Sequence, residues 1–273
     1  MLIYRDDIQK QNISLVQLIN NLQYGIDQEQ FTLVFQPQFN LDTGEIIGME
    51  ALVRWLDPEE GLIPPSKFIP LAEQTGQIYR LERIVMKKAL EQKRKWEKQG
   101  FGNLALSINL SSKTLTSASD FHEQDLLLDS YQVDYSKIVI EITETAYISD
   151  VEAVTEHLQW LKRRGIKIAL DDFGTGYSSL NYLKKLPIDI IKLDRSFVHS
   201  ITDEGLDSLM IKNILSLAHD LKFEVIAEGI ETHEQLEYLR AHSCEMGQGY
   251  LLSRPLPEES IRTLLISKYR YME

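Results

Sequence analysis

Short runs of Val, Ile, Leu and Phe recur along the chain, and most of them end at a polar or acidic residue. Between several of these runs, apolar residues fall at helical spacing over longer stretches. This alternation is typical of βα units around a parallel sheet. Eight such units favour a closed barrel. The predicted fold class is therefore α/β, a TIM-type (β/α)8 barrel.

The predicted strands cover residues 31–35, 46–49, 104–108, 138–140, 167–170, 188–191, 224–227 and 246–247. The clearest predicted helices cover residues 79–98, 151–164, 206–221 and 233–240, with Gly100 and Gly165 in positions that end a helix. A proline-rich segment, residues 57–70, is too long for a simple turn, and we expect a loop that shapes the wall of a site.

The ends of the chain carry weaker patterns than its middle. Residues 1–25 predict a helical lead-in, with Ile13, Val16 and Leu22 available for one face. Residues 26–268 form the predicted main domain, because an α/β barrel of this length is commonly a single domain. Residues 269–273 are expected to pack on the domain or to form a tail.

Composition narrows the class of protein. With 43% hydrophobic and 26% charged residues the chain is typical of a globular protein. A formal net charge of −12 argues against binding to duplex nucleic acid, which requires basic patches. Cys244 is the only cysteine, so no intramolecular disulfide can form, which fits a reducing compartment. We expect Cys244 to be a small residue of the core. We find neither a membrane span nor a secretion signal, so we expect a cytoplasmic protein.

Polar residues stand where the predicted strands end, and strand ends of a parallel barrel meet at one rim. The convergent set is Glu50, Asn109, Glu141, Asp171, Asp172, Lys192 and Glu228. Its carboxylates would repel one another unless a cation lies among them. Oxygen ligands without His or Cys favour Mg²⁺ or Mn²⁺. Two such ions with Arg54 and Lys192 leave roughly one positive charge, which would attract a ligand with two phosphodiester groups.

Structural roles compete with this interpretation. Asp and Asn at strand ends often cap the next helix, and for Asn109, followed by Ser111 and Ser112, both roles stay open. Glu caps helices poorly, so capping explains Glu50 and Glu228 badly. Lys192 either balances the acids or orients an attacking water. The histidines lack metal-site spacing, and no nucleophile elbow or phosphate-binding loop motif is present.

An ordered set of motifs resembles the EAL domain of cyclic di-GMP phosphodiesterases from about residue 31 to about residue 257. The motifs are Phe35-Gln36-Pro37, Glu50-Ala51-Leu52, Ile108-Asn109-Leu110-Ser111, Glu141-Ile142-Thr143-Glu144, the loop that starts at Asp171-Asp172, Ile191-Lys192-Leu193-Asp194, Ala227-Glu228-Gly229, Gln248-Gly249-Tyr250 and Arg254-Pro255-Leu256. Phe35 replaces a tyrosine often found in the family. The signature of the cyclase partner domain is absent, so synthesis of the dinucleotide is not expected.

The resemblance implies a barrel whose first strand is antiparallel to its neighbours, and it implies residue roles. One metal would bind Glu50, Asn109, Glu141 and Asp171, and the second would bind Asp171, Asp172 and Glu228. The implied catalytic residues are Lys192, Glu228, Glu50, Asp172 and Glu144, with Lys192 and Glu228 as rival activators of water and Glu144 steadying the Asp171 loop. The implied substrate-binding residues are Gln36, Leu52, Arg54, Asp194 and Gln248.

The implied activity is hydrolysis of cyclic di-GMP to linear pGpG with two Mg²⁺ or Mn²⁺ ions. The alternative is a catalytically silent cyclic di-GMP receptor or a protein-interaction module. The resemblance also suggests a homodimer through the barrel, with residues 181–185 as a contact. An upstream regulatory domain or partner would act through the N-terminal helix.

Overall fold

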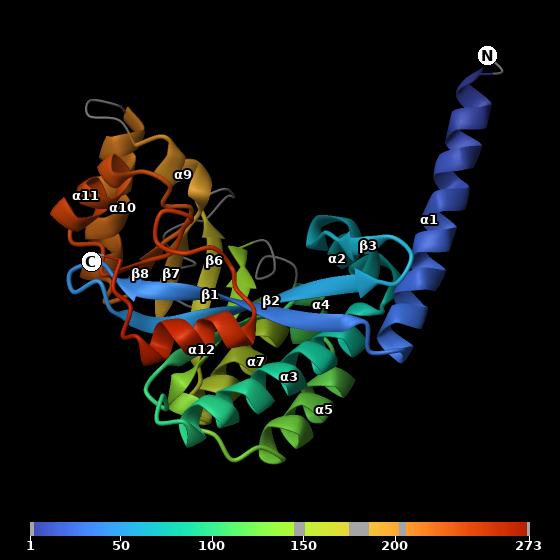
Figure 1. Ribbon diagram of the computed structural model, residues 1–273, viewed down its shortest axis with the longest axis horizontal. Helices are drawn as coiled ribbons and strands as arrows, with labels where there is room; N and C mark the ends of the chain where they lie inside the picture. The colour runs from blue at the N-terminus through green and yellow to red at the C-terminus, as the bar shows by residue number, and fades with distance from the viewer. Residues whose placement is uncertain (1–2, 145–150, 175–185, 202–205, 272–273) are drawn as a thin grey trace.

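The computed structural model describes residues 3–144, 151–174, 186–201 and 206–271 (Figure 1). Its strands are β1 (Phe31–Asn40), β2 (Ile46–Asp57), β3 (Gly61–Ile63), β4 (Ala105–Asn109), β5 (Ile138–Thr143), β6 (Lys167–Phe173), β7 (Ile190–Leu193), β8 (Glu224–Ala227) and β9 (Met246–Gly247). Its α-helices are α1 (Ile3–Asp27), α2 (Pro65–Thr75), α3 (Ile78–Lys98), α4 (Ser112–Leu115), α5 (Ala118–Asp129), α7 (Val151–Arg163), α9 (Arg195–His199), α10 (Leu206–Asp220), α11 (His233–Ala241) and α12 (Glu258–Ile266).

Within the described part of the chain, eight strands close into a barrel. The sheet order is β1-β9-β8-β7-β6-β5-β4-β2-β3, and an additional pairing of β1 with β2 closes the ring. Strand β1 is antiparallel to both β2 and β9, whereas β2 and β4 to β9 follow one another in parallel. The predicted α/β barrel is confirmed, as is the inverted first strand that the resemblance implied.

The interior of the barrel has two layers because side chains alternate along each strand. Val139, Ala169, Ile190 and Ile226 form a buried apolar cluster, joined by Ala105 and Met246. Two residues further along these strands or just after them the side chains are polar. They are Ser107, Glu141, Asp171, Lys192, Glu228 and Gln248. An apolar plug thus lies beneath a polar layer at the carboxyl ends of the parallel strands.

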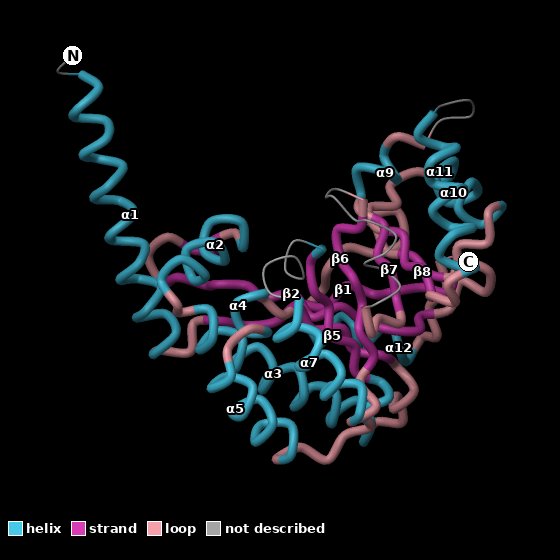
Figure 2. The backbone as a smooth tube through the Cα atoms, turned by 180° about the vertical axis from the view of Figure 1, so that it is seen from behind, coloured by secondary structure: helices cyan, strands magenta, loops and turns pink. Residues whose placement is uncertain are grey.

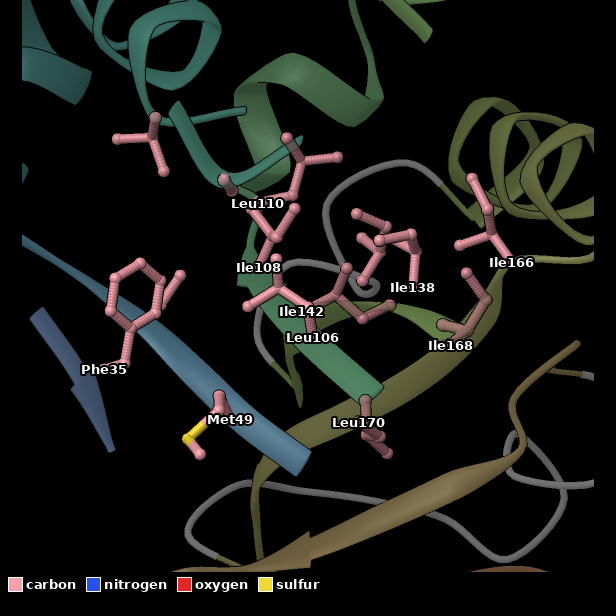
Figure 3. Close-up of a cluster of buried hydrophobic side chains, with 14 of the residues drawn as sticks. Phe35, Met49, Leu106, Ile108, Leu110, Ile138, Ile142, Ile166, Ile168 and Leu170 are labelled. Atoms are coloured by element: carbon pink, nitrogen blue, oxygen red, sulfur yellow. The ribbon is translucent and has the colours of Figure 1, made fainter. Parts of the chain in front are cut away.

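The main hydrophobic core lies between the barrel and its helices. Figure 3 shows part of it, with side chains such as Phe35, Met49, Leu106, Ile138 and Ile168 coming from different strands of the barrel. Helices α3, α5 and α7 lie on the same side of the strands in both views (Figures 1 and 2). Aromatic rings in edge-on contact join the barrel to the helices, such as Phe35 with Trp96 of α3 at 5.0 Å between ring centroids.

Several boundaries differ from the sequence-based expectation. Strand β1 continues past Pro37 to Asn40, because Phe35 and Phe39 keep alternating outward. The expectation of a loop over residues 57–70 was wrong: the segment forms β3, paired with β2, and the start of α2. Gly100 and Gly165 do end helices, with φ of 89° and 88°.

The two ends of the chain behave differently. Helix α1 extends away from the barrel in both views, and its carboxyl end is anchored by the buried Leu22 and Ile26 (Figures 1 and 2). At the other end, Tyr269 and Tyr271 pack edge-on against Phe39 of β1. Over the described residues, none of the helices has the length and apolar character that a bilayer crossing requires.

A buried lysine fixes the connection between α3 and β4. Lys93 is fully buried, and its Nζ donates hydrogen bonds to the carbonyl oxygens of Gly102 at 2.6 Å and Leu104 at 2.8 Å. Burial lowers the pKa of Lys93, although the nearby Glu97 carboxylate opposes this effect. Removing the ammonium leaves these carbonyl groups without their donor.

We therefore expect Lys93→Met to lower the free energy of unfolding by about 2–3 kcal/mol. The matched control is Lys95→Met, two positions along the same helix but exposed to solvent, which should change stability by less than about 0.5 kcal/mol. Urea denaturation of both variants measures the difference. Equal stability of the two variants would contradict this role.

Candidate active site

The polar layer gathers around one buried ammonium group. Lys192, on β7, is 1% exposed. Its Nζ lies 2.6 Å from Glu141 Oε2, 2.7 Å from Glu228 Oε1, 3.1 Å from Asp171 Oδ2 and 3.7 Å from Glu50 Oε1. These carboxylates come from four strands: Glu50 lies within β2, which continues past the predicted end to Asp57, Glu141 and Asp171 lie on β5 and β6, and Glu228 follows β8. The sequence placed them on one rim, and the structure brings them into one cluster.

Two amide side chains hold Glu50 from either side. Asn109 Nδ2 donates to Glu50 Oε1 at 2.9 Å, and Gln248 Nε2 donates to Glu50 Oε2 at 2.7 Å. Burial by itself raises the pKa of Glu50, but the Lys192 ammonium and these hydrogen bonds outweigh it. The pKa of Glu50 therefore lies below its usual value, and the side chain is a carboxylate.

The pKa values of Glu141 and Glu228 are shifted in the opposite direction to that of Glu50. Burial and the charge of Glu50 raise the pKa of Glu141 well above its usual value, against the effect of Lys192. Burial also raises the pKa of Glu228 to about 8, with Lys192 opposing and Asp171 adding to the shift. Burial disfavours the charged form of Lys192, yet the surrounding carboxylates raise its pKa well above normal. The cluster therefore holds more acid than one ammonium can neutralise.

A β-bulge presents the two aspartates. The register of β6 against β7 shifts between Leu170 and Phe173, which places Asp171 and Asp172 in the irregularity. Asp172 has φ of 55°, a left-handed conformation that Asp tolerates better than most residues. Burial and the charges of Asp171 and Asp194 raise the pKa of Asp172. The bulge thus directs consecutive acids toward different surroundings.

Glu144, predicted to steady the loop after Asp171, lies beside that loop. It is 3% exposed, and its Oε2 accepts a hydrogen bond from the backbone N–H of Gly174 at 3.2 Å. Gly174 has φ of 98°, and a Cβ at that position would lie 2.5 Å from the ring of Phe197. Only glycine fits this turn without displacing the aromatic ring. The later part of the loop, residues 175–179, lies outside the described residues.

The structure shows which of the polar residues at the strand ends cap a helix. Ser111, not Asn109, is the N-cap of α4, and its Oγ accepts from the backbone N–H of Lys113. Asn109 is left to contact Glu50. Asp194 does cap a helix: its carboxylate accepts from the backbone N–H of Ser196 at 2.9 Å at the start of α9. Its predicted contact with substrate would have to coexist with this cap.

A cavity of about 470 Å³ opens beside the acid cluster. Leu52, Arg54, Asn109 and Glu141 line it, and so do Pro65 and Ile69 of α2, so the segment expected to form a wall does so as a helix. Arg54 Nη1 donates to the carbonyl oxygen of Val53. Gln36 is paired with Glu50 across β1 and β2, and its Nε2 donates to the carbonyl oxygen of Ser253 at 3.3 Å.

Two residues near the site were missed by the sequence reasoning. Glu82 on α3 accepts hydrogen bonds from Ser111 N at 2.6 Å and Thr114 Oγ1 at 2.5 Å, and so orders the chain just after Asn109. Its only signal was an acid on the apolar face of a predicted helix. Gln38 lies inside the barrel and contacts Gln248. Its signal was the polar alternation of Gln36 and Gln38, which continues the strand beyond Pro37.

The donor chemistry of the cluster suits a hard divalent ion. Glu141 Oε1 is buried and has no hydrogen-bond partner among the residues that the structure describes, so a carboxyl oxygen in the cluster is left unsatisfied there. As the described side chains stand, no group of three or more acidic, His or Cys residues is spaced to hold a metal ion. The oxygens turn toward Lys192 Nζ instead. Metal binding would therefore require some of these carboxylates to reorient.

Comparison with known proteins matches most of the chain to one family. The family model described as the EAL domain matches residues 19–255. The bifunctional diguanylate cyclase/cyclic di-GMP phosphodiesterase MucR of Pseudomonas aeruginosa is 36% identical over 246 residues, covering 90% of this chain and 36% of MucR. Cyclic di-GMP phosphodiesterase PA2567 of the same species is 39% identical over 244 residues, covering 89% of this chain and 41% of the relative. The chain thus spans well under half the length of these relatives.

Solved structures share the fold. A structure of the PaMucR phosphodiesterase in complex with c-di-GMP superposes with a TM-score of 0.85 at 36% identity, covering 90% of this chain and 99% of that one. The EAL enzyme Bd1971 in its cAMP- and cyclic-di-GMP-bound form gives a TM-score of 0.88 at 30% identity, covering 96% of this chain and 72% of that one.

The ion cluster gives a prediction about stability without divalent ions. We expect Lys192→Met to lower the free energy of unfolding by about 3–5 kcal/mol, because it leaves buried carboxylates without their cation. Adding Glu141→Gln removes one of those acids, so the double variant should be more stable than Lys192→Met alone. Urea denaturation in EDTA measures both, with the exposed Lys212→Met as control. Additive losses would show that the two side chains do not act as a unit.

Proposed function

This chain belongs to the EAL domain family, and from that membership we propose that it hydrolyses cyclic di-GMP to linear pGpG. The observation that carries the proposal is the convergence of Glu50, Glu141, Asp171 and Glu228 on Lys192 at the carboxyl mouth of the barrel. Enzymes with this fold keep their chemistry at that mouth. A cavity opens directly beside the cluster.

Divalent ions belong to the proposal, and their ligands would be these strand-end oxygens. Glu50, Asn109, Glu141 and Asp171 would hold one ion, and Asp171, Asp172 and Glu228 would hold the other. Bound Mg²⁺ or Mn²⁺ lowers the pKa of water and offsets charge on a phosphodiester group. The unsatisfied Glu141 Oε1 and the excess of acid over ammonium support this assignment.

The side chains of the cluster then have separable tasks. Water must lose a proton as its oxygen bonds to phosphorus, and the bond from phosphorus to the 3′ oxygen breaks as that oxygen takes up a proton. Glu228, whose Oε1 lies 2.7 Å from Lys192 Nζ, is placed to exchange a proton with that water. Lys192 Nζ lies between Glu141 and Glu228 and would orient the water by donating hydrogen bonds. Glu144 would keep the Asp171 loop in place through Gly174.

Substrate contacts would come from the sides of the mouth. Arg54 would pair with a phosphate group, and Leu52 would offer an apolar contact to a base, since both line the cavity beside Glu141. Gln36, Asp194 and Gln248 complete the proposed set. Gln248 also serves the acids, because its Nε2 donates to both Glu50 and Glu228.

The wider setting of the domain is part of the same proposal. The relatives are longer than this chain, and a regulatory segment or partner could join through α1, which extends away from the barrel. A homodimer through the barrel stays a prediction, and its expected contact at residues 181–185 lies outside the described residues. The cytoplasmic location expected from the sequence also stays a prediction.

The direct test is an assay of purified protein with cyclic di-GMP and either Mg²⁺ or Mn²⁺. We expect pGpG from the unmodified chain and at least about a hundredfold lower turnover from Glu50→Ala, because a charged group at the reacting centre is lost. Glu60→Ala, an exposed acid in the turn between β2 and β3, should retain full turnover. Tight binding without turnover would instead support the silent receptor.

Arg54 should act mainly on binding. We expect Arg54→Ala to raise KM about tenfold and to lower kcat less than about threefold, because a phosphate contact is made in both the ground state and the transition state. The control is Arg262→Ala on the exposed side of α12. Steady-state kinetics would contradict this role if kcat fell as far as kcat/KM.

A further inference from the structure

Two buried amide side chains meet inside the barrel below the acid cluster. Gln38 on β1 is 3% exposed, and Gln248, just after β9, is 5% exposed. Gln38 Nε2 lies 3.3 Å from Gln248 Oε1 in the geometry of a hydrogen bond. Because β1 runs opposite to its neighbours, this contact joins the inverted strand to the residues that follow the last strand of the barrel.

The two acids that Gln248 contacts determine which of the two glutamines is the donor. Gln248 Nε2 is 2.7 Å from Glu50 Oε2 and 3.0 Å from Glu228 Oε1. A carboxylate oxygen accepts hydrogen bonds, so the NH₂ group of Gln248 must face the acids and its carbonyl must face away from them. A buried carbonyl needs a donor. Gln38 supplies that donor, and its own amide is thereby oriented as well.

Packing confines Gln38 at this position. Its partner on the neighbouring strand β2 is Gly48, and a Cβ atom added to Gly48 would lie 2.8 Å from Gln38 Oε1. The Nε2 of Gln38 also lies 3.5 Å from Ser107 Oγ on β4. Gln38 lines a cavity of about 770 Å³ at the opposite end of the barrel, together with Ile226 and Met246 of the apolar layer. It is thus separated from the substrate cavity by Gln248 and the acids.

We propose that Gln38 is a positioning residue, which holds the amide of Gln248 in the orientation that lets its NH₂ group reach both Glu50 and Glu228. Without this donor, the Gln248 amide can rotate and turn its carbonyl oxygen toward the carboxylates, where the two would repel each other. Where the inference concerns turnover it rests on the proposed function. The hydrogen-bond order itself does not.

The kinetic test uses Gln38→Leu, which removes the donor and keeps a buried side chain. We expect kcat to fall about tenfold and KM to change less than about twofold, as for the loss of one buried hydrogen bond. The matched control is Gln92→Leu on α3, a buried glutamine whose Nε2 has no hydrogen-bond partner, and its kcat should be unchanged. Melting temperatures of both variants identify any general loss of folding.

A double-mutant cycle separates positioning from a merely structural role. In a Gln248→Ala background, Gln38→Leu should lower kcat less than twofold further, because the group that Gln38 positions is gone. An equal loss in both backgrounds would overturn the inference.

A spectroscopic test needs no turnover. The side-chain amide signals of Gln248 in a ¹H–¹⁵N spectrum are identified by their disappearance in Gln248→Ala. We expect Gln38→Leu to shift these signals and to speed their hydrogen exchange at least tenfold, and Gln38→Glu, which offers an acceptor in place of the donor, to do so more strongly. Unchanged Gln248 signals in both variants would refute the inference. If the unmodified chain hydrolyses no cyclic di-GMP, the proposed function fails while this measurement still decides the role of Gln38.

Discussion

The ammonium group of Lys192 makes it possible to bury several carboxylates at the mouth of this barrel. Glu50 and Glu141 are almost fully buried, and isolated carboxylates in such places would take up protons or disrupt the fold. With Lys192 Nζ within 3.7 Å of each acid of the cluster, Glu50 keeps its charge, whereas the pKa values of Glu141 and Glu228 remain raised. Lys192 therefore makes burial of these acids possible, yet the acids outnumber the single ammonium group. Such an excess of acid is what a binding site for cations requires.

The barrel produces this cluster by a simple repeat. Strands β4 to β9 each contribute an apolar side chain to the lower layer, such as Val139 or Ile190, and a polar one two residues later, such as Glu141 or Lys192. The apolar layer underlies the polar one, which lies toward the carboxyl mouth of the barrel. Departures from regular geometry occur where the acids need different directions. The bulge at Asp171 and Asp172 and the left-handed turn at Gly174 are examples beside the site.

Much of this arrangement could be predicted from the sequence because strand ends are marked locally. A run of β-branched residues followed by Glu141 or Lys192 gives both the strand and the rim position. The inverted direction of β1 came only from family resemblance, since a strand has the same alternation in either direction. The Gln38 contact was missed because the predicted strand ended at Phe35, and the Glu82 contact was missed because it depends on how α3 packs. Asp194 illustrates the opposite case, in which a strand-end acid is also a helix cap.

The roles assigned to the acids depend on whether divalent ions bind among them. Anomalous diffraction from crystals soaked with Mn²⁺ is the most direct measurement of that claim. We expect two manganese peaks bounded by Glu50, Asn109, Glu141, Asp171, Asp172 and Glu228, with the carboxylates turned from Lys192 toward the ions. An absence of peaks at this mouth, in crystals that nonetheless bind cyclic di-GMP there, would contradict it.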